Sequence, residues 1–158
     1  TQNLDNVHFF QRAMVCRDVV DNFEMDINTL YACLAGTQKH VGTSFSDPAH
    51  VAGCFELLHL VAGGEAEWRA RPFVSNSNCF VVPPMKFAEE SCITMEACIR
   101  AGMPMLLLSA GQAGATAPAP IALAIVQAMA ECLAGVVYAN AARYDLIILE
   151  TSGIGQSD

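Results

Sequence analysis

Residues 104–142 decide the fold; they read PMLLLSAGQAGATAPAPIALAIVQAMAECLAGVVYANAA. The apolar run over 104–108 predicts a strand. A loop with two glycines follows over 109–116, and the long apolar stretch over 121–142 predicts a helix. Strand, loop and helix in this order make one βα unit.

The same unit recurs along the chain. The predicted strands cover 7–11, 39–45, 71–78, 104–109 and 145–150. Their starts are spaced by 32, 32, 33 and 41 residues, and a helix-like segment fills each gap. Near-constant spacing favours a barrel over an open doubly wound sheet. Because a closed (β/α)8 barrel takes about 250 residues, we expect an α/β fold of parallel βα units that forms part of a TIM barrel.

Prolines and capping residues mark the expected helix starts. They are Asp47-Pro48, Pro83-Pro84 and Thr116-Ala117-Pro118. The apolar face of the helix after Pro48 should consist of Val51, Phe55, Leu58 and Val61. The stretch 121–142 is apolar almost all round, so we expect a buried helix between the sheet and another layer, not a membrane span.

Composition limits the partners and the location. With 53% hydrophobic and 15% charged residues in 158, we expect one domain, part of whose apolar surface is covered by chain beyond this sequence. The net charge of −8 argues against nucleic acid and anionic membranes as partners. Seven cysteines without a C-x-x-C motif favour a reducing cytoplasm over a disulfide framework or a zinc ribbon. Residues 1–6 lack the features of a signal peptide.

Neutral polar side chains follow the predicted strands, at the sheet edge where α/β proteins form their sites. Ser44 and Phe45 follow the second strand, and Asn76 and Asn78 close the third. The loop over 109–116 follows the fourth, but it lacks the lysine and the glycine spacing of phosphate-binding motifs. A tight turn is therefore the favoured interpretation.

Within that turn, Gly114 should adopt a conformation that alanine would strain, and Thr116 should cap the long helix. Other reactive side chains are interpreted as structural. His50 and Cys54 have a spacing that suits a metal, but the sequence supplies no obvious further ligands. We expect Trp68 to serve in packing. Glu89, Glu90 and Glu96 should form a solvated helix face.

The segment 109–135, SAGQAGATAPAPIALAIVQAMAECLAG, resembles the most characteristic part of the trimethylamine methyltransferase family, which includes glycine betaine methyltransferases. Upstream pieces agree with it: Thr37–Val41, Gly63–Glu65, Arg69–Phe73 and Pro83–Lys86. The resemblance covers residues 5–140.

The resemblance implies a TIM barrel that moves a methyl group from a tertiary or quaternary amine to the cobalt of a corrinoid (cobalamin) on a separate protein. This chain would be the middle portion of such an enzyme, would bind no cofactor or metal itself, and is expected to form a homo-oligomer. The family's loop matches Gly114, Ala115, Thr116 and Pro118, which with Gln112 would line the cavity. No catalytic residue is assigned.

A methylammonium head has a diffuse positive charge, which prefers aromatic faces and oxygen dipoles to a tight ion pair. The expected substrate-binding residues of that kind are Ser44, Phe45, Asn76, Asn78 and Phe80.

The tail, residues 144–158, differs from the barrel portion over 1–143. It is similar to the Walker-B and switch region of GTPase chaperones that serve cobalamin-dependent mutases, although no P-loop precedes it. Two alternatives to the methyltransferase therefore stay open, a GTPase-related module and a non-catalytic scaffold fragment.

Overall fold

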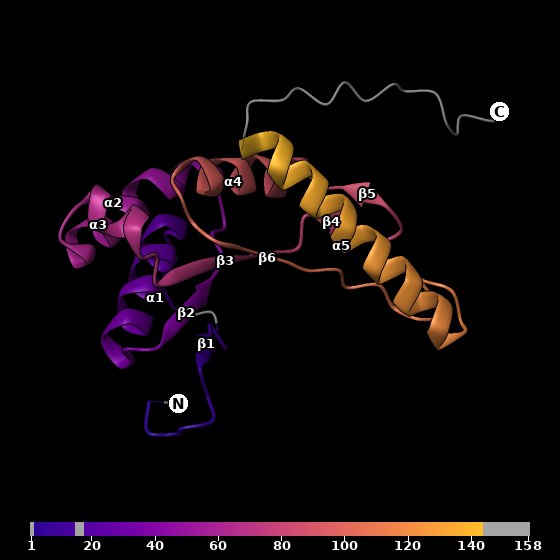
Figure 1. Ribbon diagram of the computed structural model, residues 1–158, viewed down its shortest axis with the longest axis horizontal. Helices are drawn as coiled ribbons and strands as arrows, with labels where there is room; N and C mark the ends of the chain where they lie inside the picture. The colour runs from indigo at the N-terminus through magenta and orange to yellow at the C-terminus, as the bar shows by residue number, and fades with distance from the viewer. Residues whose placement is uncertain (1, 15–17, 144–158) are drawn as a thin grey trace.

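The computed structural model describes residues 2–14 and 18–143 (Figure 1). Its main sheet has four parallel strands in the order β1-β2-β3-β6. They are β1 (Phe9–Gln11), β2 (His40–Thr43), β3 (Val74–Asn78) and β6 (Met105–Leu107). Chain order and spatial order coincide, which confirms the parallel βα units. The fifth predicted strand, 145–150, lies outside the described residues.

The strands are shorter than predicted. The third begins at Val74, not at residue 71, because Arg71 ends the preceding helix and Pro72 has no N–H to donate to a ladder. The helices of the described residues are α1 (Asn22–Gly36), the 3-10 turn η1 (Pro48–His50), α2 (Val51–Ala62), α3 (Glu65–Ala70), α4 (Glu89–Arg100) and α5 (Ile121–Arg143). All but α5 lie between strands, and α5 follows β6.

The helix start at Asp47-Pro48 is confirmed, since the Asp47 carboxylate accepts a hydrogen bond from Ala49 N at 2.8 Å. The predicted start at Pro83-Pro84 is wrong. These prolines form the turn between two short antiparallel strands, β4 (Val81–Val82) and β5 (Lys86–Phe87), and α4 begins only at Glu89. Proline suits a turn as well as a first helical turn, so the dipeptide alone does not distinguish them.

The helices pack on one face of the sheet. Val41 and Val74 point into a core that they share with Leu30, Leu58 and Trp68. Trp68 is fully buried and its indole N–H donates to Ala101 O at 3.0 Å, which confirms its role in packing. On the opposite face Phe9 and Leu106 are 37% and 40% exposed.

The apolar face predicted for α2 is confirmed at Val51, Phe55 and Leu58, which are buried. Val61 is 53% exposed and was wrongly included. Ten residues at about 100° each place it about 80° away from Val51 around the helix axis, beyond the edge of the buried face.

Helix α5 covers the sheet with one narrow side only. Its buried residues are Glu131, Gly135 and Ala141, and it packs against α4 and β6. Eight of its large apolar side chains are exposed: Ile121, Leu123, Ile125, Val126, Met129, Leu133, Val136 and Val137. By length and composition α5 could also cross a membrane, and 11% of its most apolar window is buried. The prediction of a helix buried between two layers is therefore wrong for the described residues.

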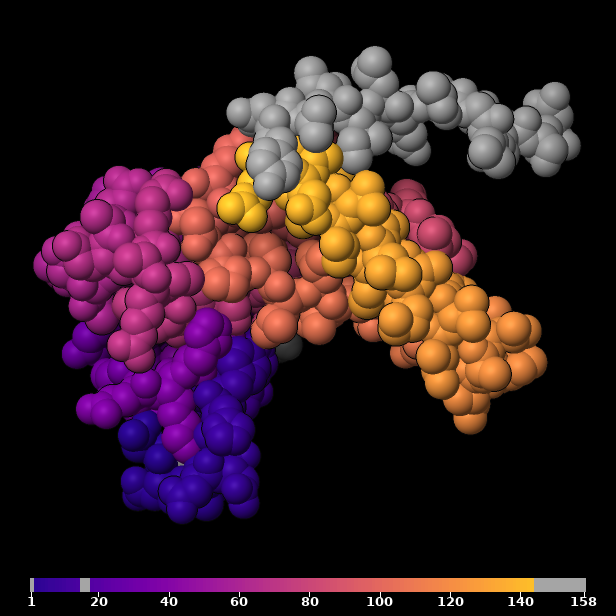
Figure 2. All heavy atoms as spheres, in the orientation of Figure 1, coloured from indigo at the N-terminus to yellow at the C-terminus, as the bar shows by residue number. Residues whose placement is uncertain are grey.

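The molecule forms an arch. Helices α1 to α3 lie at one end, α5 slopes down at the other, and the sheet joins them (Figure 1). In the space-filling view the arch is hollowed between the N-terminal part and the first half of α5 (Figure 2).

Candidate functional site

A crevice of about 240 Å³ lies where β2 and β3 end, against the first turns of α4. It brings together four of the residues predicted to bind substrate: Ser44, Phe45, Asn76 and Asn78. The α4 side of the crevice includes Glu90, which is exposed. Neighbouring parallel strands end at the same edge of the sheet, which explains why residues distant in sequence meet here: Thr43 and Asn76, 33 positions apart, are partners in the β2–β3 register.

Two asparagines in the crevice have unsatisfied hydrogen-bonding groups. Asn76 is 1% exposed, and neither its amide oxygen nor its amide nitrogen has a partner among the described residues. Asn78 donates from Nδ2 to Ser91 O at 3.0 Å, but its buried Oδ1 has no partner in the same part of the chain. A buried amide left unpaired costs about 1–3 kcal/mol, so these atoms are suited to binding a polar or cationic ligand.

Hydrogen bonds hold the loop after β2 beside the crevice. Arg12 donates from Nη2 to Ser44 Oγ at 2.6 Å. The buried carboxylate of Asp26 on α1 accepts from Ser46 N, from Ser46 Oγ and from His50 Nδ1, each at 2.8 Å. Because Ser46 and His50 both contact the same carboxylate oxygen, the three side chains are not arranged as a Ser-His-Asp triad.

Cys54, whose spacing from His50 would suit a metal site, is buried in the core. Burial, together with the nearby Asp26 charge, raises the pKa of the Cys54 thiol to about 12. The thiolate needed for metal binding is therefore strongly disfavoured, and His50 is used in the contact with Asp26.

The other predicted residues lie elsewhere. Phe80 is fully buried in a second core cluster and makes an edge-to-face contact with Phe87 at 5.3 Å. Gln112, Gly114 and Thr116 lie in the loop between β6 and α5, and none of them lines the crevice. The structure thus separates these four residues from the four that line the crevice.

The loop itself is a tight turn, as predicted. Gly114 has φ of +81°, a left-handed conformation that strains other residues. The prediction that Thr116 caps α5 is wrong, because that helix begins at Ile121. Thr116 instead stabilises its own loop: its Oγ1 accepts from Gln112 N at 2.9 Å, and its carbonyl accepts from Gln127 Nε2 at 2.9 Å.

Sequence reasoning missed a buried carboxylate at Glu131. It accepts hydrogen bonds from Met85 N at 2.9 Å, from Gln127 Nε2 at 3.1 Å and from Ser109 Oγ. Burial raises the pKa of Glu131, but these hydrogen bonds outweigh it and hold the pKa below its ordinary value. The signal was available, since a single acidic residue in the middle of an apolar helix calls for a buried partner.

Glu96 is also not fully solvated as predicted. It accepts a hydrogen bond from the Tyr138 hydroxyl of α5 and pairs with Arg100 at 3.5 Å. Glu89 and Glu90 are exposed, which confirms the prediction for these two.

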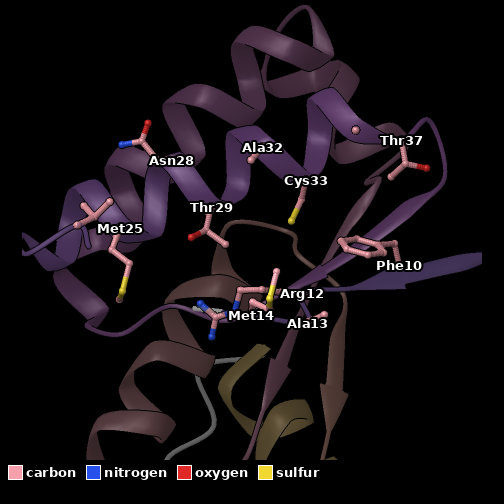
Figure 3. Close-up of a pocket in the computed structure, with 12 residues that line it drawn as sticks. Phe10, Arg12, Ala13, Met14, Met25, Asn28, Thr29, Ala32, Cys33 and Thr37 are labelled. Carbon is pink, nitrogen blue, oxygen red and sulfur yellow. The ribbon is translucent and has the colours of Figure 1, made fainter. Parts of the chain in front are cut away.

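A larger cavity, about 650 Å³, lies between α1 and the segment after β1. Figure 3 shows Phe10 and Arg12 below the α1 residues Thr29 and Cys33. None of the predicted substrate-binding residues lines it. Arg12 connects it to the crevice through its hydrogen bond to Ser44.

On the uncovered face of the sheet, Gln11 reaches across β2. Ser77 Oγ donates to Gln11 Oε1 at 2.6 Å, which links β1 to β3. In the register Gly42 pairs with Gln11 on one side and with Ser75 on the other, so Gln11 reaches diagonally to Ser77. A Cβ at Gly42 would overlap both Gln11 Oε1 and the Phe9 ring.

Comparison with known proteins decides the family. The model of the family described as trimethylamine methyltransferase (MTTB) matches residues 1–146. The chain belongs to the trimethylamine methyltransferase family. This confirms the resemblance expected from the sequence, and the match extends only to the first residues of the tail.

Members of the trimethylamine methyltransferase family from archaea and bacteria are similar to this chain. The trimethylamine methyltransferase MttB of Methanosarcina thermophila is 26% identical over 137 residues, which are 86% of this chain and 28% of that protein. The MttB of Desulfitobacterium hafniense is 31% identical over 119 residues, 75% of this chain and 22% of that protein. The chain spans less than a third of the length of these curated relatives.

The segment that carries the family resemblance, 109–135, corresponds to the loop after β6 and the first two thirds of α5. It contains Ser109, Gln127 and Glu131, the three side chains of the buried carboxylate network. The segment that resembles the family therefore also contains the hydrogen bonds that two of its own side chains make to the buried Glu131 carboxylate.

Proposed function

We propose that this chain is one sector of a (β/α)8-barrel methyltransferase that moves a methyl group from a tertiary or quaternary amine, such as trimethylamine or glycine betaine, to a corrinoid on a partner protein. The observation that carries this proposal is the family match over residues 1–146. The corrinoid supplies the cobalt that accepts the methyl group. No residue of this chain is proposed to hold it.

The sheet supports the barrel. Its strands follow one another in chain order, and its helices pack on one face. A doubly wound sheet instead reverses its strand order and carries helices on both faces. In a barrel the uncovered face is the interior, and the remaining strands and helices would cover α5 and the edges of β1 and β6.

The carboxyl edge of the sheet supports a site for a methylated amine. Phe45 offers an aromatic surface, Asn76 and Asn78 offer buried amide oxygens that have no partner within the described part of the chain, and Glu90 adds a negative charge. Such groups attract a diffuse positive charge without a tight ion pair. Positioning and exclusion of water, more than a protein base, would then serve the transfer.

Location and assembly belong to the same proposal. The described cysteines are free, from Cys33 to Cys132, which supports a reducing cytoplasm. The net charge of −8 suits a partner with a basic surface. We further propose a homo-oligomer.

Isothermal titration calorimetry of the protein at its natural full length tests the function. Glycine betaine or trimethylamine should bind, and Asn76→Leu should weaken binding about tenfold through the lost amide contacts. Asn28→Leu, an exposed asparagine on α1, is the matched control and should bind as the unmodified protein does. Binding of GTP–Mg²⁺ would support a GTPase-related module instead, and binding of neither class would support a scaffold.

A further inference from the structure

One side-chain amide in the crevice has a fixed orientation. Asn78 is buried, and its Nδ2 donates to Ser91 O at 3.0 Å, which links the end of β3 to the first turn of α4. Turning this amide by 180° would place Oδ1 against the Ser91 carbonyl oxygen, and neither of these atoms can donate. The hydrogen bond therefore settles which side of the amide is left for a ligand, and that side carries the acceptor Oδ1.

The acceptor that Asn78 presents is unpaired. Its Oδ1 is buried and has no hydrogen-bond partner within residues 2–14 and 18–143, and Asn78 lines the crevice. A buried acceptor that meets a donor contributes to binding, whereas an acceptor covered by methyl groups has lost water and gained no partner in return. The crevice therefore favours a ligand with a hydrogen-bond donor at this point over a ligand of the same charge without one.

The other groups of the crevice suit any methylated ammonium ion. Both amide atoms of Asn76 lack a partner in the described part of the chain, so this amide can turn either its oxygen or its nitrogen toward a ligand. Glu90 is exposed in the first turn of α4, where its charge attracts every cation and water can hydrogen-bond its carboxylate. The ring of Phe45 likewise attracts every diffuse positive charge. Of these groups, Asn78 is the one that distinguishes a cation with an N–H from a cation without one.

We propose that Asn78 is a specificity-determining residue, whose Oδ1 accepts a hydrogen bond from the N–H of a protonated tertiary amine, so that the crevice binds tertiary amines in preference to quaternary ones. This inference rests on the proposed function and narrows its substrate class. A tertiary alkylamine is protonated at neutral pH, since alkylammonium groups such as that of lysine titrate at about pH 10, and it then has one N–H. A quaternary ammonium has a methyl group in place of that hydrogen and cannot donate to Asn78.

Isothermal titration calorimetry at pH 7 with two matched probes tests the inference in the full-length protein. Trimethylammonium and tetramethylammonium have the same charge and differ only in that a methyl group replaces the N–H. Trimethylammonium should bind about tenfold more tightly, the value of one hydrogen bond that involves a charged group. A preference of the same size should separate N,N-dimethylglycine from glycine betaine, which repeats the comparison with a carboxylate present in both ligands. Asn78→Leu should reduce the affinity for trimethylammonium to that for tetramethylammonium.

Two further variants serve as controls. Glu90→Gln removes a charge from the crevice, so it should weaken the binding of both probes and leave the ratio of their affinities unchanged. Asn28→Leu also removes an asparagine whose Nδ2 donates to a backbone carbonyl, Glu24 O at 2.8 Å, but Asn28 does not line the crevice. It should alter neither affinity.

The two probes give different answers for the inference and for the proposed function. Equal affinities, or tighter binding of tetramethylammonium, would overturn the inference and leave an amine site in place. This comparison uses the unmodified protein, so it decides even if Asn78→Leu does not fold. A preference for trimethylammonium that survives in Asn78→Leu, or that disappears in Glu90→Gln, would overturn the role of Asn78. If the unmodified protein bound none of the four ligands, the proposed function would fail and this inference with it.

Discussion

At the scale of single residues, the stability of the fold depends on the buried carboxylate of Glu131 and its hydrogen bonds. Three donors from the β4–β5 turn, the loop after β6 and α5 itself meet on one buried carboxylate. Glu131→Gln replaces an acceptor with a donor that faces these donors, so we expect a loss of about 1–3 kcal/mol in the free energy of unfolding. Urea denaturation measures it, and Glu56→Gln, exposed on α2, should change stability by less than about 0.5 kcal/mol.

The same residue predicts a pH dependence. The folded-state pKa of Glu131 lies below its ordinary value of 4.5. Ionisation therefore contributes stability that is fully present above pH 4.5 and is lost as the pH falls through the folded pKa. The stability difference between the unmodified protein and Glu131→Gln should shrink below that pH, and a constant difference down to pH 3 would contradict the assignment.

Individual residues also show where sequence reasoning stops. Ser44, Phe45, Asn76 and Asn78 could be grouped from sequence because parallel strands end at one edge. The hydrogen bond between Gln11 and Ser77 could not be predicted, since it depends on the strand register and on the space that Gly42 leaves beside Gln11.

At the scale of elements, the contact between α5 and the β4–β5 hairpin depends on Gly135. A Cβ there would lie 2.6 Å from Phe80 Cε1, and Phe80 is fully buried. Gly135→Ala should therefore cost about 1–3 kcal/mol through overpacking, despite the better helix propensity of alanine. Gly36→Ala is the control: no atom lies within 4 Å of its Cβ position, and we expect a gain of about 0.4–1 kcal/mol. Thermal unfolding of both variants decides the point, and a stabilised Gly135→Ala would show that the ring moves freely.

Which elements could be predicted depended on their length and surroundings. The strands of the main sheet could be predicted from their runs of β-branched and aromatic residues. The strands of the β4–β5 hairpin, on either side of Pro83-Pro84, have two residues each. Two residues are too few to show the alternation of apolar and polar side chains that marks a strand. The burial of α5 could not be inferred from its composition, because composition does not show how many neighbours a helix has.

At the scale of the whole molecule, the uncovered surfaces predict self-association. The outer side of α5 exposes apolar side chains such as Val126 at 63% and Val137 at 61%. Within residues 2–14 and 18–143, β1 and β6 are edge strands with one neighbour each. Unpaired strand edges and large apolar patches favour association. Residues 1–158 expressed alone should therefore form oligomers in light scattering, and a clean monomer over a wide concentration range would argue against a barrel sector.

The buried carboxylate of α5 has a consequence for how that helix is oriented about its own axis. A helix that is apolar almost all round can rotate with little change in hydrophobic burial. A turn of one residue, about 100°, would move Glu131 away from Ser109 and Met85 N and would replace Gly135 with a larger side chain against Phe80. One polar residue and one glycine thus set the rotational register of 23 residues, and the apolar remainder of the helix is free to serve whichever surface covers it.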